Sequence, residues 1–387
     1  MAINSMNLAL SKDGDLESAC SFSPQYEQAS SFNLKKFRRK CKGNPCANLK
    51  NGRSDLQIVC VLILAISLGV FSRAPVLKQA AIPRYVGAAL GQGHLQNATD
   101  PNFRTIAAIE YSGATPENEM KWEIIEPFQN VFNFTPGDVI RDFSRAHDFT
   151  LRGHTLVWHN QLAPFVSTLN GTDLLHAMTN HITKVMTHYK GQIFAWDVVN
   201  EALNDDGTLG PSPFLTQIGP SYIETAFRTA RAADPHAKLY INDFNTEGIN
   251  NKSDALLAIV KNLKKENLID GVGFQSHFIV GEVPTDLQAN LQRFVDAGVQ
   301  VAITELDVRT TLPVTQAAAE QHPKDFAFVV NACKAISDCV GVTTWGITDL
   351  YSWIPGTFPG MGFGLLWDDS YVKKPAYFSV LETLEAH

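Results

Sequence analysis

Short apolar or β-branched runs alternate with longer amphipathic stretches from about residue 81 to the C-terminus. The runs are continuously apolar rather than alternating, which is typical of strands buried on both faces, and strands separated by helices are expected to run parallel. Eight such units predict an α/β fold of the (β/α)8 TIM-barrel type, built as a single domain. The runs are YVGAAL (from 85), IEYSGAT (109), FTLRGHTLVW (149), IFAWDVV (193), KLYIND (238), GVGFQSH (271), VAITELDV (301) and GVTTWGITD (341).

A doubly wound parallel sheet is the rival architecture for alternating strands and helices. Its first strand would be followed by a phosphate-binding loop with the spacing G-x-G-x-x-G. The first predicted strand here leads through GAALGQGHL, at residues 87–95, which lacks that spacing. The helical candidates include residues 212–235 and 285–298, and the barrel remains the preferred prediction.

The N-terminal region is typical of a targeting sequence. Residues 1–56 form a polar and basic extension, residues 57–79 a hydrophobic signal or signal-anchor segment, and residues 80–387 the predicted barrel domain. The apolar run at 58–71 is shorter than the ~20 residues of a bilayer span and suits a signal peptide. Because the leader exceeds the ~15–30 residues usual for such peptides, a type II membrane anchor through residues 57–72 is the alternative to secretion.

Charge is divided unevenly along the chain. Residues 1–80 hold 11 Lys and Arg against 5 Asp and Glu, whereas the remaining residues hold 21 against 34. A body with such an acidic excess is a poor binder of nucleic acid, so we expect no nucleic-acid partner.

Cysteine usage favours an exported protein. The predicted barrel keeps two cysteines, Cys333 and Cys339, whose spacing at a helix-to-strand junction allows a local disulfide bond that an oxidising compartment would preserve. Two buried thiols are the alternative. Sequons for N-glycosylation also fit a secretory route, and they occur at Asn97, Asn133, Asn170 and Asn251.

Polar residues follow the apolar runs at six of the eight predicted strands. In (β/α)8 barrels the chemistry gathers at the C-terminal ends of the strands, so these side chains are expected to converge on one mouth. They are Glu117, Asn118 and Lys121 after strand two, His154 and Trp158 at strand three, Asn200 and Glu201 at strand four, Gln275 and His277 at strand six, Glu305 and Asp307 at strand seven, and Trp345 at strand eight.

The spacing of these residues carries geometric information. Glu305 and Asp307 are two apart on one strand and share a face, and His277 on the neighbouring strand is expected to lie beside both. An imidazole between two carboxylates would help to keep Glu305 ionised. Glu201 lies three strands away, and two carboxylates facing each other across a cleft form the general plan of glycoside hydrolysis.

Eight sequence blocks resemble the signature blocks of glycoside hydrolase family 10, the endo-β-1,4-xylanases, and especially of its secreted fungal members. They run in order from about Ala80 to the C-terminus. The resemblance implies a (β/α)8 catalytic domain that hydrolyses internal β-1,4 bonds of xylan with retention of anomeric configuration. The blocks are TPENEMKW, GHTLVWH, WDVVNE, YINDFNTE, GFQSH, ITELD, TTWGITDLYSW and LLWDDSYVKKPAY.

The resemblance also implies a role for each matching residue. Glu201 corresponds to the general acid/base and Glu305 to the nucleophile, which His277 and Asp307 would orient. Asn200 would hold the 2-hydroxyl of the sugar being cleaved. The remaining substrate-binding residues implied are Glu117, Asn118, Lys121, His154, Trp158, Gln275, Trp345 and Trp353.

The ligands implied are xylan and xylo-oligosaccharides, with no metal and no organic cofactor, and we expect a monomer. The chain departs from the family pattern at Phe165, where tryptophan is usual, at Asn130, where glycine is usual, and at Glu119, where a small residue is common. These departures affect the expected sugar contacts rather than the reaction. A barrel glycosidase acting on another β-linked glucan and an inactive sugar-binding barrel are the alternatives, and retention of both glutamates disfavours the second.

Overall fold

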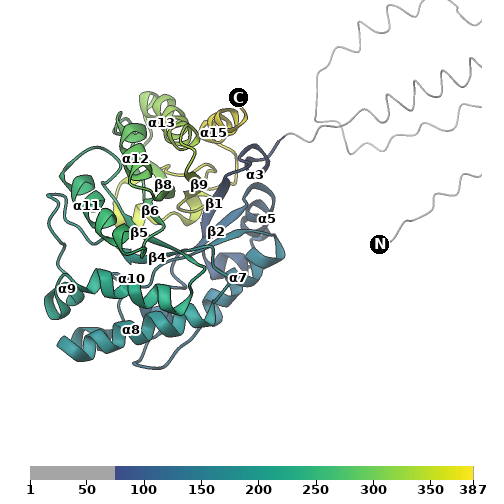
Figure 1. The fold of residues 1–387 in the computed structure, drawn as a ribbon. Coiled ribbons are helices and arrows are strands. Elements are labelled where there is room, and N and C mark those ends of the chain that lie inside the picture. Colours follow the sequence, from purple (N-terminus) through teal and green to yellow (C-terminus); the bar gives the residue numbers. More distant parts are fainter. Residues whose placement is uncertain (1–74, 387) are drawn as a thin grey trace, which may run out of the picture. The chain divides into compact units, whose positions relative to one another are not determined.

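The computed structural model of the chain describes residues 75–386, in which eight parallel strands close into a barrel (Figure 1). Strand β1 pairs with β2 on one side and with β9 on the other, which completes the closure. The predicted (β/α)8 fold is thereby confirmed. The barrel strands are β1 (Tyr85–Leu90), β2 (Gly113–Pro116), β3 (Thr150–Gly153), β4 (Ala195–Asn200), β5 (Lys238–Asp243), β6 (Gly271–Phe274), β8 (Gln300–Thr311) and β9 (Cys339–Thr344).

The longer helices surround the barrel and cover its outer face (Figure 1). Their starts follow ordinary capping chemistry: the Asp100 side chain accepts a hydrogen bond at the start of α5, and Asn250 and Ser253 form a capping box on α11. These helices are α5 (Pro101–Glu110), α7 (Thr135–Ala146), α8 (Gly171–His188), α10 (Tyr222–Ala233), α11 (Asn251–Lys265), α12 (Leu287–Asp296), α13 (Gln316–Lys334) and α15 (Pro375–Glu385).

Shorter elements occupy the connections between strands and helices. The predicted helix at 212–235 is divided at Gly219, whose φ of 89° ends α9 before Pro220. The short elements are α3 (Leu77–Ala80), α4 (Gln92–Leu95), α6 (Trp122–Ile125), η1 (Pro164–Thr168), α9 (Pro213–Ile218), β7 (His277–Ile279), η2 (Asp349–Tyr351), α14 (Ile354–Thr357) and β10 (Met361–Gly362).

Large side chains pack on both faces of the barrel strands, and glycines on neighbouring strands make room for them. Trp196 on β4 is fully buried, and a Cβ atom added at Gly153 on β3 would lie 2.2 Å from its ring. Tyr240 on β5 meets Gly271 on β6 at the same distance. A side chain at Gly153 would therefore collide with Trp196, which packs towards α8, and one at Gly271 would collide with Tyr240 inside the barrel.

Several strand boundaries differ from the sequence prediction. Strand three was expected to include His154 and Trp158, but β3 ends at Gly153 and both residues follow it. The run at 109 was expected to form strand two from its first residue, but residues 109 and 110 complete α5 and the strand begins at Gly113. Gln275 and His277 were expected to end one strand together. Strand β6 instead ends at Phe274, Ser276 adopts a φ of 66°, and His277 begins β7, which pairs with β8.

The described residues begin inside the segment predicted as a signal or anchor. Leu77, in α3, is fully buried, and its backbone N–H donates to Oε2 of Glu110 at 3.2 Å. Helix α3 also contacts α15. Residues 1–74, which include the predicted extension and most of segment 57–79, lie outside the described residues. Among residues 75–386, none of the helices combines the length and the apolar character that a membrane span requires.

The two cysteines of the barrel are joined. Cys333 in α13 and Cys339 in β9 form a disulfide bond with their Cα atoms 5.3 Å apart, as their spacing allows. Both cysteines are buried, and the bond links α13 to the start of β9 across the short turn between them.

Candidate active site

A cavity of about 620 Å³ opens at the C-terminal ends of the barrel strands. Twelve of the thirteen catalytic and substrate-binding residues named from the sequence line it. The thirteenth, Asp307, is fully buried in β8 and contacts the cavity-lining His277 from behind. The twelve are Glu117, Asn118, Lys121, His154, Trp158, Asn200, Glu201, Gln275, His277, Glu305, Trp345 and Trp353.

Both carboxylate oxygens of Glu201 accept hydrogen bonds. Oε2 accepts from Nε1 of Trp158 at 2.7 Å, and Oε1 accepts from Nε2 of Gln275 at 2.9 Å and from Nδ2 of Asn200 at 3.2 Å. Glu201 follows the last residue of β4 and has a φ of 53°, while its backbone N–H donates to the carbonyl of Asn242. The orientation of this carboxyl is therefore fixed from three strands. Trp158, which was expected to bind substrate, also supplies a hydrogen-bond donor to Glu201 that the sequence did not reveal.

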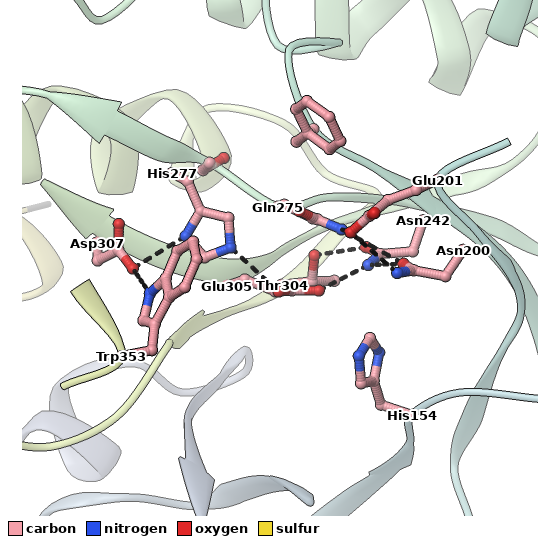
Figure 2. Close-up of polar contacts among 12 residues, drawn as sticks. His154, Asn200, Glu201, Asn242, Gln275, His277, Thr304, Glu305, Asp307 and Trp353 are labelled. Atoms are coloured by element: carbon pink, nitrogen blue, oxygen red, sulfur yellow. Dashed lines mark hydrogen bonds and ion pairs between the residues drawn. The ribbon is translucent and has the colours of Figure 1, made fainter. Parts of the chain in front are cut away.

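Glu305 lies in β8 and faces a row of donors, which Figure 2 shows together with Glu201. Its Oε2 is 3.1 Å from Nε2 of His277, and its Oε1 accepts from Nδ2 of Asn242 at 2.8 Å. The other ring nitrogen of His277 lies 2.9 Å from Oδ2 of Asp307, which also accepts from Nε1 of Trp353 at 2.7 Å. The imidazole is thus held between two carboxylates.

The electrostatics of this cluster favour an ionised Glu305. Burial alone would lower the pKa of His277, but the charge of Asp307 and the hydrogen bonds to Asp307 and Glu305 raise that pKa to about 10. Burial would likewise raise the pKa of Glu305, yet its hydrogen bond with His277, the charges of His154 and His277 and the Asn242 amide hold that pKa below its ordinary value. A protonated His277 donates from both nitrogens and leaves Glu305 an anion.

An amide bridge connects the two candidate carboxylates. Nδ2 of Asn242 donates to Oδ1 of Asn200 at 2.8 Å and to Oε1 of Glu305, while the hydroxyl of Thr304 donates to Oδ1 of Asn242 at 2.7 Å. Asn200 in turn contacts Glu201. Sequence analysis did not select Asn242, although it precedes the last residue of β5 and pairs in register with Asn200.

His154 has a buried acidic partner. Its Nδ1 lies 3.0 Å from Oδ2 of Asp197, and the other carboxylate oxygen of Asp197, Oδ1, pairs with the buried guanidinium of Arg152. The ring of His154 meets that of Trp345 edge-on, with centroids 5.3 Å apart. The contacts with Asp197 and Trp345 therefore fix the position of the His154 ring in the cavity lining.

A second polar group lies after β2. Nζ of Lys121 donates to Oδ1 of Asn118 at 2.9 Å and to Oε1 of Gln161 at 2.7 Å. Burial raises the pKa of Glu117 to about 7 and lowers the pKa of Lys121. Glu119 does not line the cavity: its carboxylate accepts from the backbone N–H groups of residues 92 and 118 and so fastens the β1 and β2 loops together.

Aromatic rings form one wall of the cavity. The ring of His277 lies 4.8 Å from that of Trp353 and 6.3 Å from that of Trp345, measured between centroids. The Trp353 ring also meets the edge of Phe358 at 5.5 Å. Flat apolar faces next to hydrogen-bonding carboxylates suit the two sides of a pyranose ring.

The site can therefore perform acid and nucleophilic chemistry together. Glu305 is kept ionised, while Glu201 is held by neutral donors at the other end of the amide bridge. Different environments for two carboxyl groups in one cleft are the arrangement that glycoside hydrolysis requires. No cluster of His, Cys, Asp or Glu arranged to hold a metal ion occurs within residues 75–386.

Comparison with curated proteins identifies close relatives. The chain is 44% identical to an endo-1,4-beta-xylanase of Agaricus bisporus, over 84% of this chain and 99% of that protein. It is 47% identical to endo-1,4-beta-xylanase A of Phanerodontia chrysosporium, over 78% of this chain and 74% of that protein.

Solved structures give the same result. A glycosylated endo-beta-1,4-xylanase from Gloeophyllum trabeum matches with a TM-score of 0.79 and 60% identity, over 80% of this chain and 99% of that one. Xylanase 10B from Thermotoga petrophila, solved in complex with xylobiose, matches with a TM-score of 0.79 and 37% identity, over 81% of this chain and 98% of that one. The family model of glycosyl hydrolase family 10 matches residues 75–383. The chain therefore belongs to glycosyl hydrolase family 10.

Proposed function

We propose that the protein is an endo-1,4-β-xylanase that hydrolyses internal bonds of xylan with retention of anomeric configuration. The observation that carries this proposal is the pairing of Glu305, held ionised by His277, with Glu201 in one cavity. Family membership and the activity named for the fungal relatives support the substrate. Xylan and xylo-oligosaccharides are the proposed ligands.

The first step forms a covalent intermediate. A carboxylate oxygen of Glu305 attacks the anomeric carbon and forms an ester bond while the glycosidic bond breaks. Protonated Glu201 gives its proton to the departing oxygen, so the leaving chain is released as a neutral alcohol. Trp158 and Gln275 hold Glu201 in position for this transfer.

The second step returns the enzyme to its starting state. Ionised Glu201 takes a proton from water as that water attacks the anomeric carbon, and the bond to Glu305 breaks. Two displacements at one carbon restore its original configuration. Asn200 is proposed to bind the 2-hydroxyl of the sugar being cleaved, in a contact that strengthens at the transition state.

Substrate selection is assigned to the cavity walls. Glu117, Asn118, Lys121 and His154 are proposed to bind sugar hydroxyls. Trp345 and Trp353 are proposed to limit the space beside the reacting ring, which favours xylose over a sugar that carries a hydroxymethyl group. Both rings lie beside His277, which contacts Glu305, and this supports the assignment.

We further propose that the protein is secreted and acts as a monomer. The disulfide bond between Cys333 and Cys339 supports an oxidising compartment. Asn170 is exposed and is the preferred glycosylation site, whereas the sequon at Asn251 depends on Ser253, whose side chain is buried in the capping box of α11.

Reducing-sugar release from xylan and from soluble cellulose tests the proposal, with Glu305→Ala as the inactive control. We expect cleavage of xylan to exceed that of cellulose and to disappear in the variant. Greater activity on cellulose would favour a glucan hydrolase. Binding of xylan by the folded protein without any release of sugar would favour a binding protein.

A further inference from the structure

Arg309 is a cationic residue of the cavity to which the proposed reaction gives no role. It lies in β8, four residues beyond Glu305 and two beyond Asp307, so the three side chains share one face of the strand. It is half-buried and lines the same cavity as the candidate carboxylates. Its backbone carbonyl accepts from the N–H of Val280 at 2.9 Å, which fixes the strand at this point.

The guanidinium of Arg309 lacks an acidic partner among residues 75–386. Its Nε is buried without a hydrogen-bond partner, and its one side-chain hydrogen bond within residues 75–386 is a long one of 3.5 Å from Nη1 to the carbonyl of His277. The other cations of the cavity have their partners: Lys121 donates to two side-chain oxygens, and protonated His277 donates to Asp307 and Glu305. A buried donor without a partner is costly, so Arg309 is the cavity cation with unused donors.

An aromatic ring holds the guanidinium in place. The Cζ atom of Arg309 lies 4.2 Å from the centroid of Phe358, which packs in turn against Trp353. Stacking of this kind fixes the plane of the fork and lowers the entropy lost when a ligand binds. Packing on Phe358 does not by itself require a charged residue at position 309. An apolar side chain could pack on the same ring and would leave no hydrogen-bond donor unpaired.

We propose that Arg309 binds the carboxylate of a uronic acid branch on the xylan main chain. A planar guanidinium with free donors matches a carboxylate, and charge-assisted hydrogen bonds of this kind are stronger than neutral ones. The charged groups of the cavity include the carboxyl groups of Glu117, Glu201 and Glu305, and residues 81–387 carry 34 Asp and Glu against 21 Lys and Arg. An acidic branch therefore needs a local cation, which Arg309 supplies. This inference rests on the proposed hydrolysis of xylan.

Two matched substrates test the proposal. One is a xylo-oligosaccharide of defined length with a single uronic acid branch, and the other is the same molecule with the branch carboxyl reduced to the alcohol. The readout is the ratio of kcat/KM for the acidic substrate to kcat/KM for the neutral one, in which any general loss of activity cancels. Unbranched xylohexaose serves as a third substrate, because failure to cleave it would reject the proposed function itself.

We expect a ratio of about ten in the unaltered protein, the value of one charge-assisted hydrogen bond. The ratio should fall to about one in Arg309→Gln, remain above one in Arg309→Lys, and decline with added salt. Arg228→Gln is the matched control, since Arg228 is exposed on α10 and pairs with Glu224 and Glu266. It should keep the unaltered ratio.

Three results would overturn the proposal. The first is a ratio near one in the unaltered protein. The second is a ratio in Arg309→Gln that equals the ratio in the unaltered protein. The third is a ratio in the unaltered protein that does not change with added salt. An equal loss of kcat/KM on both substrates in Arg309→Gln and Arg309→Lys would assign Arg309 a packing role on Phe358 instead. If Arg309→Gln does not fold, Arg309→Lys and the salt dependence of the unaltered protein still decide the question.

Discussion

Nε2 of His277 lies 3.1 Å from Oε2 of Glu305, while the opposite ring nitrogen contacts Asp307. The imidazole ring therefore has a carboxylate group next to each of its two nitrogens. This explains why His277 has a pKa of about 10 despite its burial, and why the pKa of Glu305 is held down although burial acts to raise it. Each member of the cluster keeps the next in its charged form.

Replacement of His277 by glutamine should raise the pKa of Glu305, because the neutral amide removes a positive charge and a charge-assisted hydrogen bond. We expect kcat to fall about 10- to 100-fold and the acidic limb of the kcat/KM profile to move to higher pH. Profiles on xylohexaose from pH 3 to 9 measure this. His236→Asn, at an exposed position, is the control. An acidic limb unchanged in His277→Gln would contradict the account.

The same pair predicts how stability varies with pH. The raised pKa of His277 contributes stability that is present in full below 6.5 and lost as the pH rises through about 10. The lowered pKa of Glu305 contributes stability that is present above 4.5 and lost as the pH falls. The difference in unfolding free energy between the unaltered protein and His277→Gln should therefore be largest between about pH 4.5 and 6.5. Urea titrations at several pH values measure it, and a constant difference up to pH 10 would count against the assignment.

Asn242→Ala should disrupt both carboxylates at once. The change removes the donor that Oδ1 of Asn200 and Oε1 of Glu305 share and leaves the hydroxyl of Thr304 without its acceptor. We expect a loss of about 1–3 kcal/mol in unfolding free energy and a fall in kcat larger than any change in KM. Asn262→Ala, on the exposed face of α11, should change neither quantity. Ordinary kcat in Asn242→Ala would remove Asn242 from the site.

Trp158→Phe separates the two properties of that residue. The variant keeps an aromatic face for sugar but loses the N–H that donates to Oε2 of Glu201 at 2.7 Å. We expect kcat to fall about tenfold with KM little changed, since one hydrogen bond that positions the acid is lost. If KM rose and kcat stayed the same, Trp158 would act on substrate binding alone.

The disulfide bond should contribute stability without affecting catalysis. Closure of so short a loop between Cys333 and Cys339 is worth about 2 kcal/mol in the chain-entropy model. The double variant Cys333→Ala/Cys339→Ala should lose about that amount in urea unfolding and keep its kcat at 25 °C. A double variant as stable as the unaltered protein would assign the bond no net contribution.

The barrel and most of the candidate site could be predicted because both depend on patterns local in the chain. Continuous apolar runs mark parallel strands, and polar residues after such runs point to the mouth of a barrel. Asn130, which stands where glycine is usual, has a φ of 64°, a region that asparagine adopts more readily than most residues. Gln275 and His277 still line the cavity, although Ser276 divides their strand.

The remaining features depend on where side chains point in the folded protein. Contacts between residues far apart in the sequence determine this, so the sequence pattern around each residue does not predict it. Asn242 was missed because a polar residue near the end of KLYIND is equally expected at an ordinary strand boundary. The hydrogen bond of Trp158 to Glu201 arises because residue 157 pairs with residue 199 beyond the end of β3. Arg309 belongs to none of the sequence blocks that carried the family resemblance, and its free donors become visible only when its neighbours are placed.

Trapping of the covalent intermediate tests the central claim most directly. A xylobioside with fluorine at C2 and an acidic leaving group should esterify the nucleophile and react onward slowly, because fluorine destabilises the positive charge of both transition states. Digestion and mass spectrometry of the labelled protein locate the sugar. The account predicts one equivalent on the peptide containing Glu305 and none in Glu305→Gln. Label on another residue, or turnover of unmodified xylohexaose to products of inverted configuration, would contradict it.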